Sequence, residues 1–205
     1  MTAATLPIPS VVEAHPRGDR ATDVFSRLLS ERVVFLGDQV DDTVANIVVA
    51  QLLHLHAADP DKEVALYVNS PGGSVTAGLA ILDTMRYVSC PVRTVCIGQA
   101  ASIAAVILAC GSPARRLALP HSRVLLHQPW GQARGQASDL QGHADEFRRL
   151  RALLWELLGA ATGRDATTVA ADADRDLVLP AARARAYGLV DEVVETAQAA
   201  PARAA

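Results

Sequence analysis

Short apolar runs alternate with helical patterns along most of this chain. The run Val33–Leu36 stops at Gly37 and is typical of a buried strand. After Asp42 and Thr43, which can cap a helix, apolar residues recur at three- and four-residue spacing. The same alternation predicts further strands over 64–69, 92–97, 116–119, 123–127 and 190–194, and further helices over 75–87, 100–109, 138–159 and 180–187. Strands that alternate with helices at this spacing pair in parallel, so we predict an α/β fold.

One domain is expected over residues 23–195, because no internal repeat or linker interrupts them. Residues 1–22 hold several prolines and few large apolar side chains, which favours a flexible leader, either a propeptide or an ordered arm of an assembly. Residues 196–205 are expected to form a disordered tail for the same reason. The helix over 138–159 is long and follows a glycine-rich segment, so we expect it to project from the body.

The composition is that of a globular protein, since half of the 205 residues are hydrophobic and 20% are charged. The net charge of −3 comes without clustered lysine and arginine, which argues against nucleic-acid binding. The three cysteines lack the spacing of a zinc site or a disulfide framework, so no metal site is predicted. Neither a signal peptide nor an apolar stretch of about 18 residues is found, so we expect a cytoplasmic protein without a membrane span.

The segment Gly98–Ala104 places a serine between small residues at a predicted strand-to-helix transition. Ala100 and Ala104 stand two residues before and two residues after Ser102. A sharp turn that carries a nucleophile requires small residues at these places. The ordinary alternative is that Ser102 only caps the following helix.

A second segment, Ser70–Ser74, contains two consecutive glycines directly after a predicted strand. Such glycines let the backbone approach a ligand closely and point N–H groups at it, as an oxyanion hole requires. A plain turn is the alternative. A phosphate-binding loop is not favoured, because no Gly-Lys-Ser/Thr sequence follows.

His127 ends an apolar strand that Pro129 stops, so it is expected at a sheet edge where a histidine can act as general base. A histidine with only structural hydrogen bonds is the alternative. The acidic cluster over 172–176 supplies candidate acids, and spacing alone does not choose among them. Together these segments offer a nucleophile, a base, an acid and backbone donors, a set that is recognised by geometry rather than by order along the chain.

These segments together resemble the proteolytic subunit of the Clp protease, the ClpP family. The resemblance runs from about Ile8 to Glu195, and it rests on Phe25–Leu29, Tyr67–Gly73, Gly98–Ser102, His127–Pro129, Gly135–Ala137, Asp174–Asp176 and Tyr187–Asp191. It implies the ClpP/crotonase superfold of stacked ββα units, with residues 129–159 as a projecting handle. Residues 1–22 would then be a propeptide plus an axial gate.

The resemblance also assigns the site. It implies that Ser102 is the nucleophile, His127 the base and Asp176 the orienting acid. The oxyanion donors fall on the backbone N–H groups of Gly73 and Ile103. The expected activity is that of an ATP-dependent serine endopeptidase.

The resemblance further implies an assembly. Asp174 and Arg175 match positions that pair across two rings and couple assembly to activity. The implied particle is a homo- or hetero-tetradecamer of two heptameric rings, which a hexameric AAA+ Clp unfoldase feeds with unfolded polypeptide. The unfoldase uses ATP, whereas this subunit is expected to need no metal or cofactor.

Three positions depart from the family pattern. Ile103 and Ala104 replace the usual Met-Gly after the serine, and Trp130 stands where a smaller aliphatic residue is common. The β-branched Ile103 is expected to alter the S1 pocket or to restrict the turn. These departures keep open a weakly active structural or regulatory subunit of a mixed particle. A crotonase-type acyl-CoA enzyme on the same fold is a further alternative, which would leave the serine, histidine and aspartate unexplained.

Overall fold

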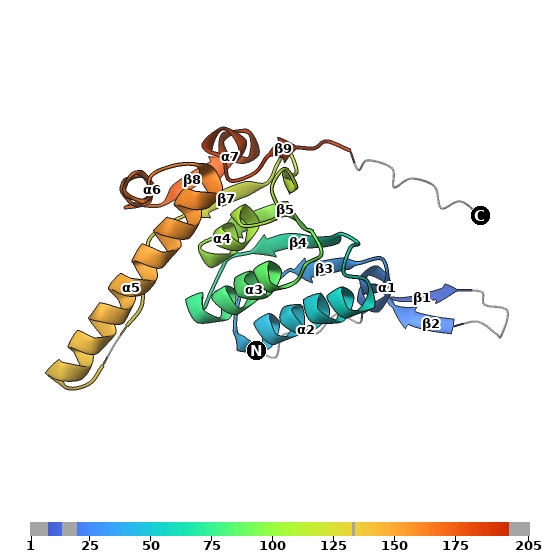
Figure 1. The fold of residues 1–205 in the computed structure, drawn as a ribbon, viewed down its shortest axis with the longest axis horizontal. Helices are drawn as coiled ribbons and strands as arrows, with labels where there is room; N and C mark the ends of the chain where they lie inside the picture. The colour runs from blue at the N-terminus through green and yellow to red at the C-terminus, as the bar shows by residue number, and fades with distance from the viewer. Residues whose placement is uncertain (1–7, 14–19, 133, 197–205) are drawn as a thin grey trace.

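The computed structural model describes residues 8–13, 20–132 and 134–196. In its main sheet, parallel strands follow the order β3 (Val33–Leu36), β4 (Val64–Ser70), β5 (Val92–Ala101), β6 (Arg116–Ala118) and β9 (Glu192–Val193). Strand β7 (Arg123–Leu126) pairs in parallel with the end of β5 and antiparallel with β8 (Leu177–Pro180). The predicted α/β fold is confirmed (Figure 1).

Helices α2 (Asp42–Ala58), α3 (Val75–Tyr87) and α4 (Ile103–Ala109) pack next to one another along this sheet (Figure 1). Every residue of α4 is apolar and buried. A helix that is apolar on all sides has to be enclosed by other elements, so α4 lies in the middle of the core. Ser102 directly precedes this helix, and the core therefore holds the backbone on its C-terminal side.

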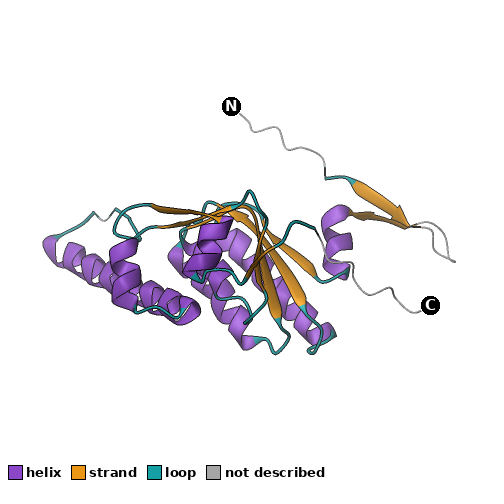
Figure 2. Ribbon diagram, turned by 90° about the horizontal axis from the view of Figure 1, so that it is seen from above, coloured by secondary structure: helices purple, strands orange, loops and turns teal. Residues whose placement is uncertain are grey.

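Helix α5 (Ala137–Thr162) projects from the body, as predicted (Figures 1 and 2). Its buried residues lie between Leu154 and Gly159, in the half that contacts the body. Its outer half carries exposed ion pairs within the helix, such as that between Glu146 and Arg149. The remaining helices of the described ranges are α1 (Val24–Ser30), α6 (Ala166–Asp172) and α7 (Ala181–Tyr187).

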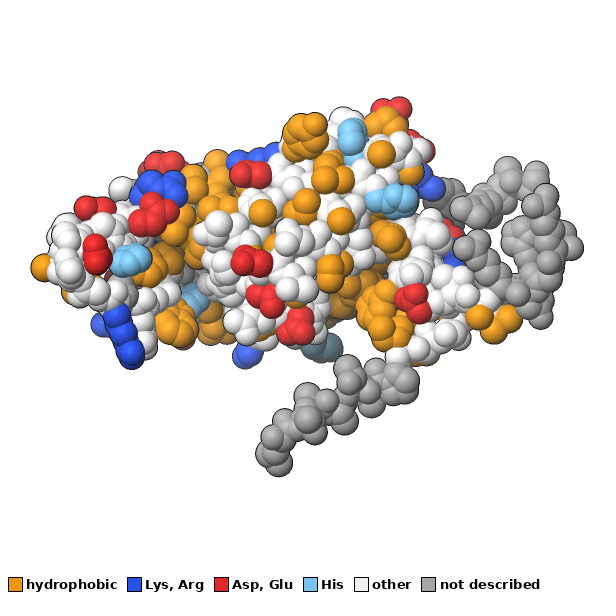
Figure 3. Space-filling model, turned by 90° about the horizontal axis from the view of Figure 1, so that it is seen from below, with side chains coloured by type: hydrophobic (Ala, Val, Ile, Leu, Met, Phe, Trp, Pro, Cys, Tyr) orange, Lys and Arg blue, Asp and Glu red, His pale blue; other side chains and the backbone are white. Residues whose placement is uncertain are grey.

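The charges on the surface and the hydropathy of the helices indicate whether the chain is suited to bind nucleic acid or to cross a membrane. Figure 3 shows one face of the molecule, on which lysine and arginine side chains are scattered among acidic and hydrophobic ones. This face therefore presents no continuous basic patch. Within the described ranges, no helix combines the length and the hydropathy that crossing a membrane requires.

The boundary between β5 and α4 differs from the prediction. The pattern predicts a strand that ends before Gly98 and a helix from residue 100, whereas β5 continues to Ala101 and α4 begins at Ile103. Gly98 has a φ of +83° and lies at an irregularity in the β4–β5 pairing. The side chain of Asn69 accepts the Gln99 N–H at 3.2 Å, which bridges this irregularity and lets the strand resume.

Other elements lacked a clear sequence signal. Helices α1 and α6 and strand β8 were not predicted, because each of them buries at most one residue and therefore shows no regular apolar pattern. Helix α2 is capped by Asp41, whose side chain accepts the Val44 N–H, rather than by Asp42 or Thr43.

Part of the leader has regular structure. Strands β1 (Ser10–Glu13) and β2 (Arg20–Asp23) pair as an antiparallel hairpin. Pro9 does not interrupt this hairpin, because it contributes only its carbonyl, which accepts the Val24 N–H at 3.0 Å. The role of the leader as propeptide or gate stays a prediction, and residues 1–7, 14–19 and 197–205 lie outside the described residues.

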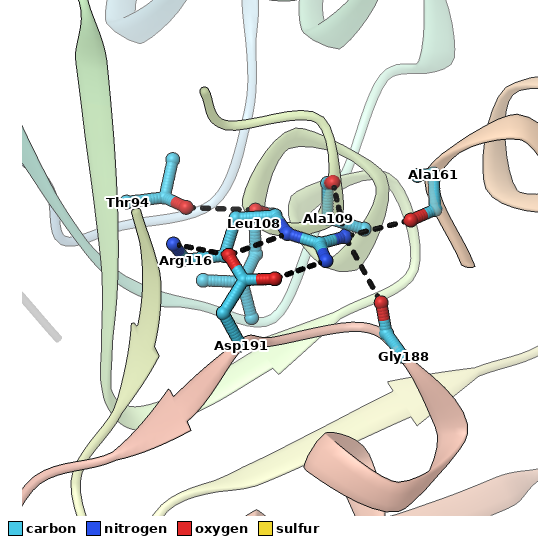
Figure 4. A network of polar contacts seen from close by, with 7 residues as sticks. All are labelled: Thr94, Leu108, Ala109, Arg116, Ala161, Gly188 and Asp191. Atoms are coloured by element: carbon cyan, nitrogen blue, oxygen red, sulfur yellow. Dashed lines mark hydrogen bonds and ion pairs between the residues drawn. The ribbon is translucent and has the colours of Figure 1, made fainter. Parts of the chain in front are cut away.

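The side chain of Arg116 joins the ends of three helices (Figure 4). Its Nη1 donates to the carbonyl oxygens of Ala109 at 3.2 Å, Ala161 at 2.8 Å and Gly188 at 2.9 Å, at the C-terminal ends of α4, α5 and α7. Carbonyls at a helix C-terminus carry partial negative charge, so a guanidinium is favourable there. Both carboxylate oxygens of Asp191 accept from the other guanidinium nitrogens, and one also accepts the Arg116 backbone N–H.

We predict that Arg116→Ala lowers the free energy of unfolding by about 1.5–3 kcal/mol, because it leaves the partly buried Asp191 and the helix-end carbonyls without their partner. Arg149→Ala is the matched control, since it breaks an ion pair with Glu146 that is exposed and screened by solvent. Urea unfolding measures both variants. An equal loss of stability in the two would contradict the structural role of Arg116.

The ion pair between Arg116 and Asp191 also predicts that the stability of the fold depends on pH. Hydrogen bonds from Arg116 hold the pKa of the Asp191 carboxyl below its usual value of 3.8. A depressed folded-state pKa contributes stability above the unfolded pKa, and this contribution is lost as the pH falls through the folded pKa. The stability difference between wild type and Asp191→Asn should therefore shrink as urea unfolding is repeated below pH 3.8.

Candidate active site

Ser102 occupies a strained turn between β5 and α4. Its φ is +56° and its ψ is −128°, a conformation that residues other than glycine rarely adopt. Its backbone N–H donates to the Leu125 carbonyl in β7 at 2.9 Å, and its carbonyl accepts the Ala105 N–H at 3.0 Å. The Ser102 hydroxyl caps no backbone N–H of α4. Ser102 therefore stands at the N-cap position of α4 without the side-chain hydrogen bond of an ordinary helix cap.

The two glycines of the Ser70–Ser74 segment are required by close backbone contacts. A Cβ atom on Gly72 would lie 2.7 Å from the Ser102 Cβ, so this residue packs directly on the turn. A Cβ atom on Gly73 would lie 2.2 Å from the Val40 carbonyl oxygen. Val40 also pairs with the loop, since it donates to the Gly72 carbonyl at 2.8 Å and accepts the Ser74 N–H at 2.7 Å.

Two backbone donors at this turn are unused. Among the described residues, neither the Gly73 N–H nor the Ile103 N–H donates a hydrogen bond. Both belong to residues beside the serine: Gly73 lines its pocket, and Ile103 follows it in the chain. These are the donors that the resemblance assigns to the oxyanion hole, and that role stays a prediction.

Ser102 and the half-buried His127 line one pocket of about 400 Å³. The complete lining is Gln39, Pro71, Gly72, Gly73, Val75, Ser102, His127, Pro129 and Trp130. All of these residues lie in segments that follow the carboxyl ends of β3, β4, β5 and β7, where open parallel sheets bind their ligands. Motif analysis missed Gln39, and this rule about strand ends is the signal that points to it.

The β7–β8 register relates one acid to the histidine. The last antiparallel pair joins Leu126 to Leu177. His127 directly follows β7 and Asp176 directly precedes β8, so the two residues lie next to this last pair of the strands. The Asp176 side chain is nevertheless exposed. In the described part of the chain, no hydrogen bond joins Asp176 to His127 or His127 to Ser102.

The other acids of the cluster have different surroundings. Asp172 accepts the Tyr187 hydroxyl at 2.9 Å, and burial together with this bond raises the pKa of Tyr187 to about 12. The Asp174 carboxylate lies 4.0 Å from the Arg175 Nε, and both side chains are exposed. The inter-ring role that the resemblance gives to Asp174 and Arg175 stays a prediction.

Most of the chain, including the residues of the candidate site, matches a known protein family. The family is described as Clp protease, and the match covers residues 16–197. The chain belongs to the Clp protease family. The resemblance predicted from the sequence is thereby confirmed, and a peptidase function follows from the family. Members of the Clp protease family generally form rings with unfoldase partners.

In this Clp protease, the residue after the serine packs into the core. The Ile103 side chain is 1% exposed and does not line the pocket. It lies against α3, where a Cβ atom on Gly78 would come within 2.1 Å of the Ile103 Cγ1. The expectation that Ile103 alters the S1 pocket therefore finds no support, because its side chain fills the space that Gly78 leaves open.

No metal cluster accompanies the Clp protease site within the described ranges, where no group of three or more histidine, cysteine, aspartate and glutamate side chains is arranged to hold an ion. Cys90 and Cys96 are buried and Cys110 is partly buried, and all three are free thiols.

We predict that Gly78→Ala destabilises this Clp protease by about 1–3 kcal/mol, because its methyl group overlaps Ile103. The double variant with Ile103→Ala should recover part of that cost, since the overlapping atoms are gone. Gly37→Ala is the control, because nothing lies within 4 Å of a Cβ atom at that position. Urea unfolding of the single and double variants gives the coupling energy, and additive losses would refute the proposed contact.

Proposed function

We propose that this chain is a serine endopeptidase subunit that cleaves unfolded polypeptides. The observation that carries the proposal is the strained turn that presents Ser102 to the same pocket as His127. A positive φ at a residue other than glycine is costly, and it is retained mainly at functional sites. The unused N–H groups of Gly73 and Ile103 support the same conclusion.

In the proposed mechanism, the Ser102 hydroxyl oxygen attacks the carbonyl carbon of the scissile peptide bond. His127 takes the proton from the hydroxyl and delivers it to the leaving amine. The Gly73 and Ile103 N–H groups stabilise the negative charge on the carbonyl oxygen. A water molecule, deprotonated by His127, then hydrolyses the acyl-enzyme and releases Ser102. Asp176 orients the imidazole and stabilises its protonated form.

The proposed particle consists of two heptameric rings around an inner chamber, built from this chain alone or together with a sister subunit. A hexameric AAA+ unfoldase supplies unfolded substrate and consumes ATP, and this chain works in the cytoplasm without a metal or cofactor. Asp174 and Arg175 pair across the rings and link assembly to activity. Their exposure in the single chain supports this, because both charged groups are accessible to a second ring.

A second candidate function is that of a weakly active structural or regulatory subunit in a mixed particle. The exposed Asp176, without a hydrogen bond to His127 among the described residues, favours it. The crotonase-type alternative has less support, since the family match is to Clp protease.

We predict that a fluorophosphonate probe adds once to the wild-type chain and not to Ser102→Ala, as measured by intact mass. Ser89→Ala, an exposed serine outside the pocket, should label like the wild type. Labelling that appears only after a sister subunit is added would favour the second candidate function. A folded chain that stays unlabelled under both conditions would refute the serine mechanism.

We predict that Asp176→Asn lowers kcat by several orders of magnitude, on the order of the 10⁴ loss known for such triads, while the fold is retained. Asp172→Asn is the matched control, because an amide oxygen still accepts the Tyr187 hydroxyl. Peptide hydrolysis and size-exclusion chromatography are compared for both variants. Near-full activity of Asp176→Asn in an intact particle would show that another residue orients His127.

A further inference from the structure

Trp130 is an exposed aromatic side chain on the wall of the Ser102 pocket. Its exposed fraction is 79%, and it lies in the segment that follows β7 and His127. The backbone on both sides of it is constrained. Pro129 has a fixed φ, and a Cβ atom on Gly131 would come within 2.4 Å of the Phe147 ring in α5. The backbone that carries the indole at the pocket is therefore restricted on both sides.

The rest of the pocket is almost free of charge. Pro71, Val75 and Pro129 are apolar, Gln39 is neutral, and His127 is the one side chain of the lining that can carry a charge. A charged substrate side chain would lose its water here without gaining a partner, whereas an apolar one gains by leaving water. Tryptophan adds a preference for aromatic substrate side chains, because a pair of aromatic rings is stabilised by more than the burial of its apolar area.

We infer that Trp130 is a specificity-determining residue, whose indole packs on the substrate side chain next to the scissile bond and selects aromatic side chains over small ones. The inference rests on the proposed function of Ser102. It goes beyond that function by naming the class of substrate side chain and the residue that selects it. Trp130 takes no part in the chemical step.

The test uses two fluorogenic peptides that differ only in the residue before the cleaved bond, which is phenylalanine or alanine. In the full chain and its native particle, Trp130→Ala should lower kcat/KM for the phenylalanine peptide roughly three- to tenfold, the size expected for one aromatic pair. The alanine peptide should change by less than about twofold, and Trp130→Phe should keep most of the preference.

Tyr87→Ala is the matched control. Tyr87 is 78% exposed, like Trp130, but it lies at the end of α3 and outside the pocket. It should leave kcat/KM for both peptides unchanged. An equal loss on both peptides in Trp130→Ala, or an unchanged ratio between them, would overturn the inference, because a residue that only supports folding or assembly affects the two peptides alike.

Fluorophosphonate labelling separates this inference from the proposed function. If Trp130→Ala is labelled like the wild type but loses the preference for the phenylalanine peptide, the proposed function and this inference are both supported. If the wild type is neither labelled nor able to cleave peptides, the proposed function fails. Peptide binding to Trp130 then tests the inference separately. With Trp155→Phe and Ser102→Ala combined, Trp130 is the only tryptophan left of the two in the chain.

In that variant, once thermal melting has shown it to be folded, the phenylalanine peptide should shift the Trp130 emission to shorter wavelength as it covers the indole. The alanine peptide should shift it less at the same concentration. Equal shifts, or no shift with either peptide, would overturn the role of Trp130 independently of catalysis.

Discussion

The guanidinium of Arg116 lies where the C-terminal ends of α4, α5 and α7 meet, and Asp191 neutralises it there. Each of these helices borders a part of the site: α4 begins directly after Ser102, α5 follows the segment that carries Trp130, and α7 follows β8, which begins after Asp176. The pair is partly buried, and removing an ion pair from water is costly unless its hydrogen bonds are complete. The same contacts that complete those bonds therefore fix the three helix ends relative to one another.

The turn at Ser102 is connected to these contacts through α4, which begins directly after Ser102 and whose C-terminal end accepts a hydrogen bond from Arg116. A positive φ costs about 1–3 kcal/mol and persists only where surrounding contacts over-determine the backbone. Here β7 pairs with the end of β5 and accepts the Ser102 N–H, while Gly72 packs against the serine from the opposite loop. The buried α4 prevents relaxation on the other side. The pocket is thus a consequence of how β5, β7 and α4 are held.

Much of this fold could be predicted from the sequence, because strands such as β4 are buried along almost their whole length and appear as continuous apolar runs. The strand–helix alternation and the projecting helix follow from such local patterns. The positive φ of Ser102 and the position of Gln39 depend on contacts between distant segments, which no local pattern contains. The choice among the acids also required more than spacing: the resemblance favours Asp176, and the β7–β8 register is an independent reason for it.

The proposed nucleophile, base and acid differ in how firmly the surrounding structure holds them. Ser102 bonds to the Leu125 carbonyl and His127 follows β7 directly, so both depend on the β5–β7 pairing inside the main sheet. Asp176 lies in the short connection between α6 and β8, and its side chain is exposed. A contact that rearranges this connection therefore changes the distance from acid to base and leaves the nucleophile in place. The charged side chains of Asp174 and Arg175 are exposed on the same connection, so the proposed contact between rings would reach the segment that carries Asp176. In the proposed particle, the difference between an active subunit and a weakly active one is whether assembly brings the Asp176 carboxylate within hydrogen-bond distance of His127.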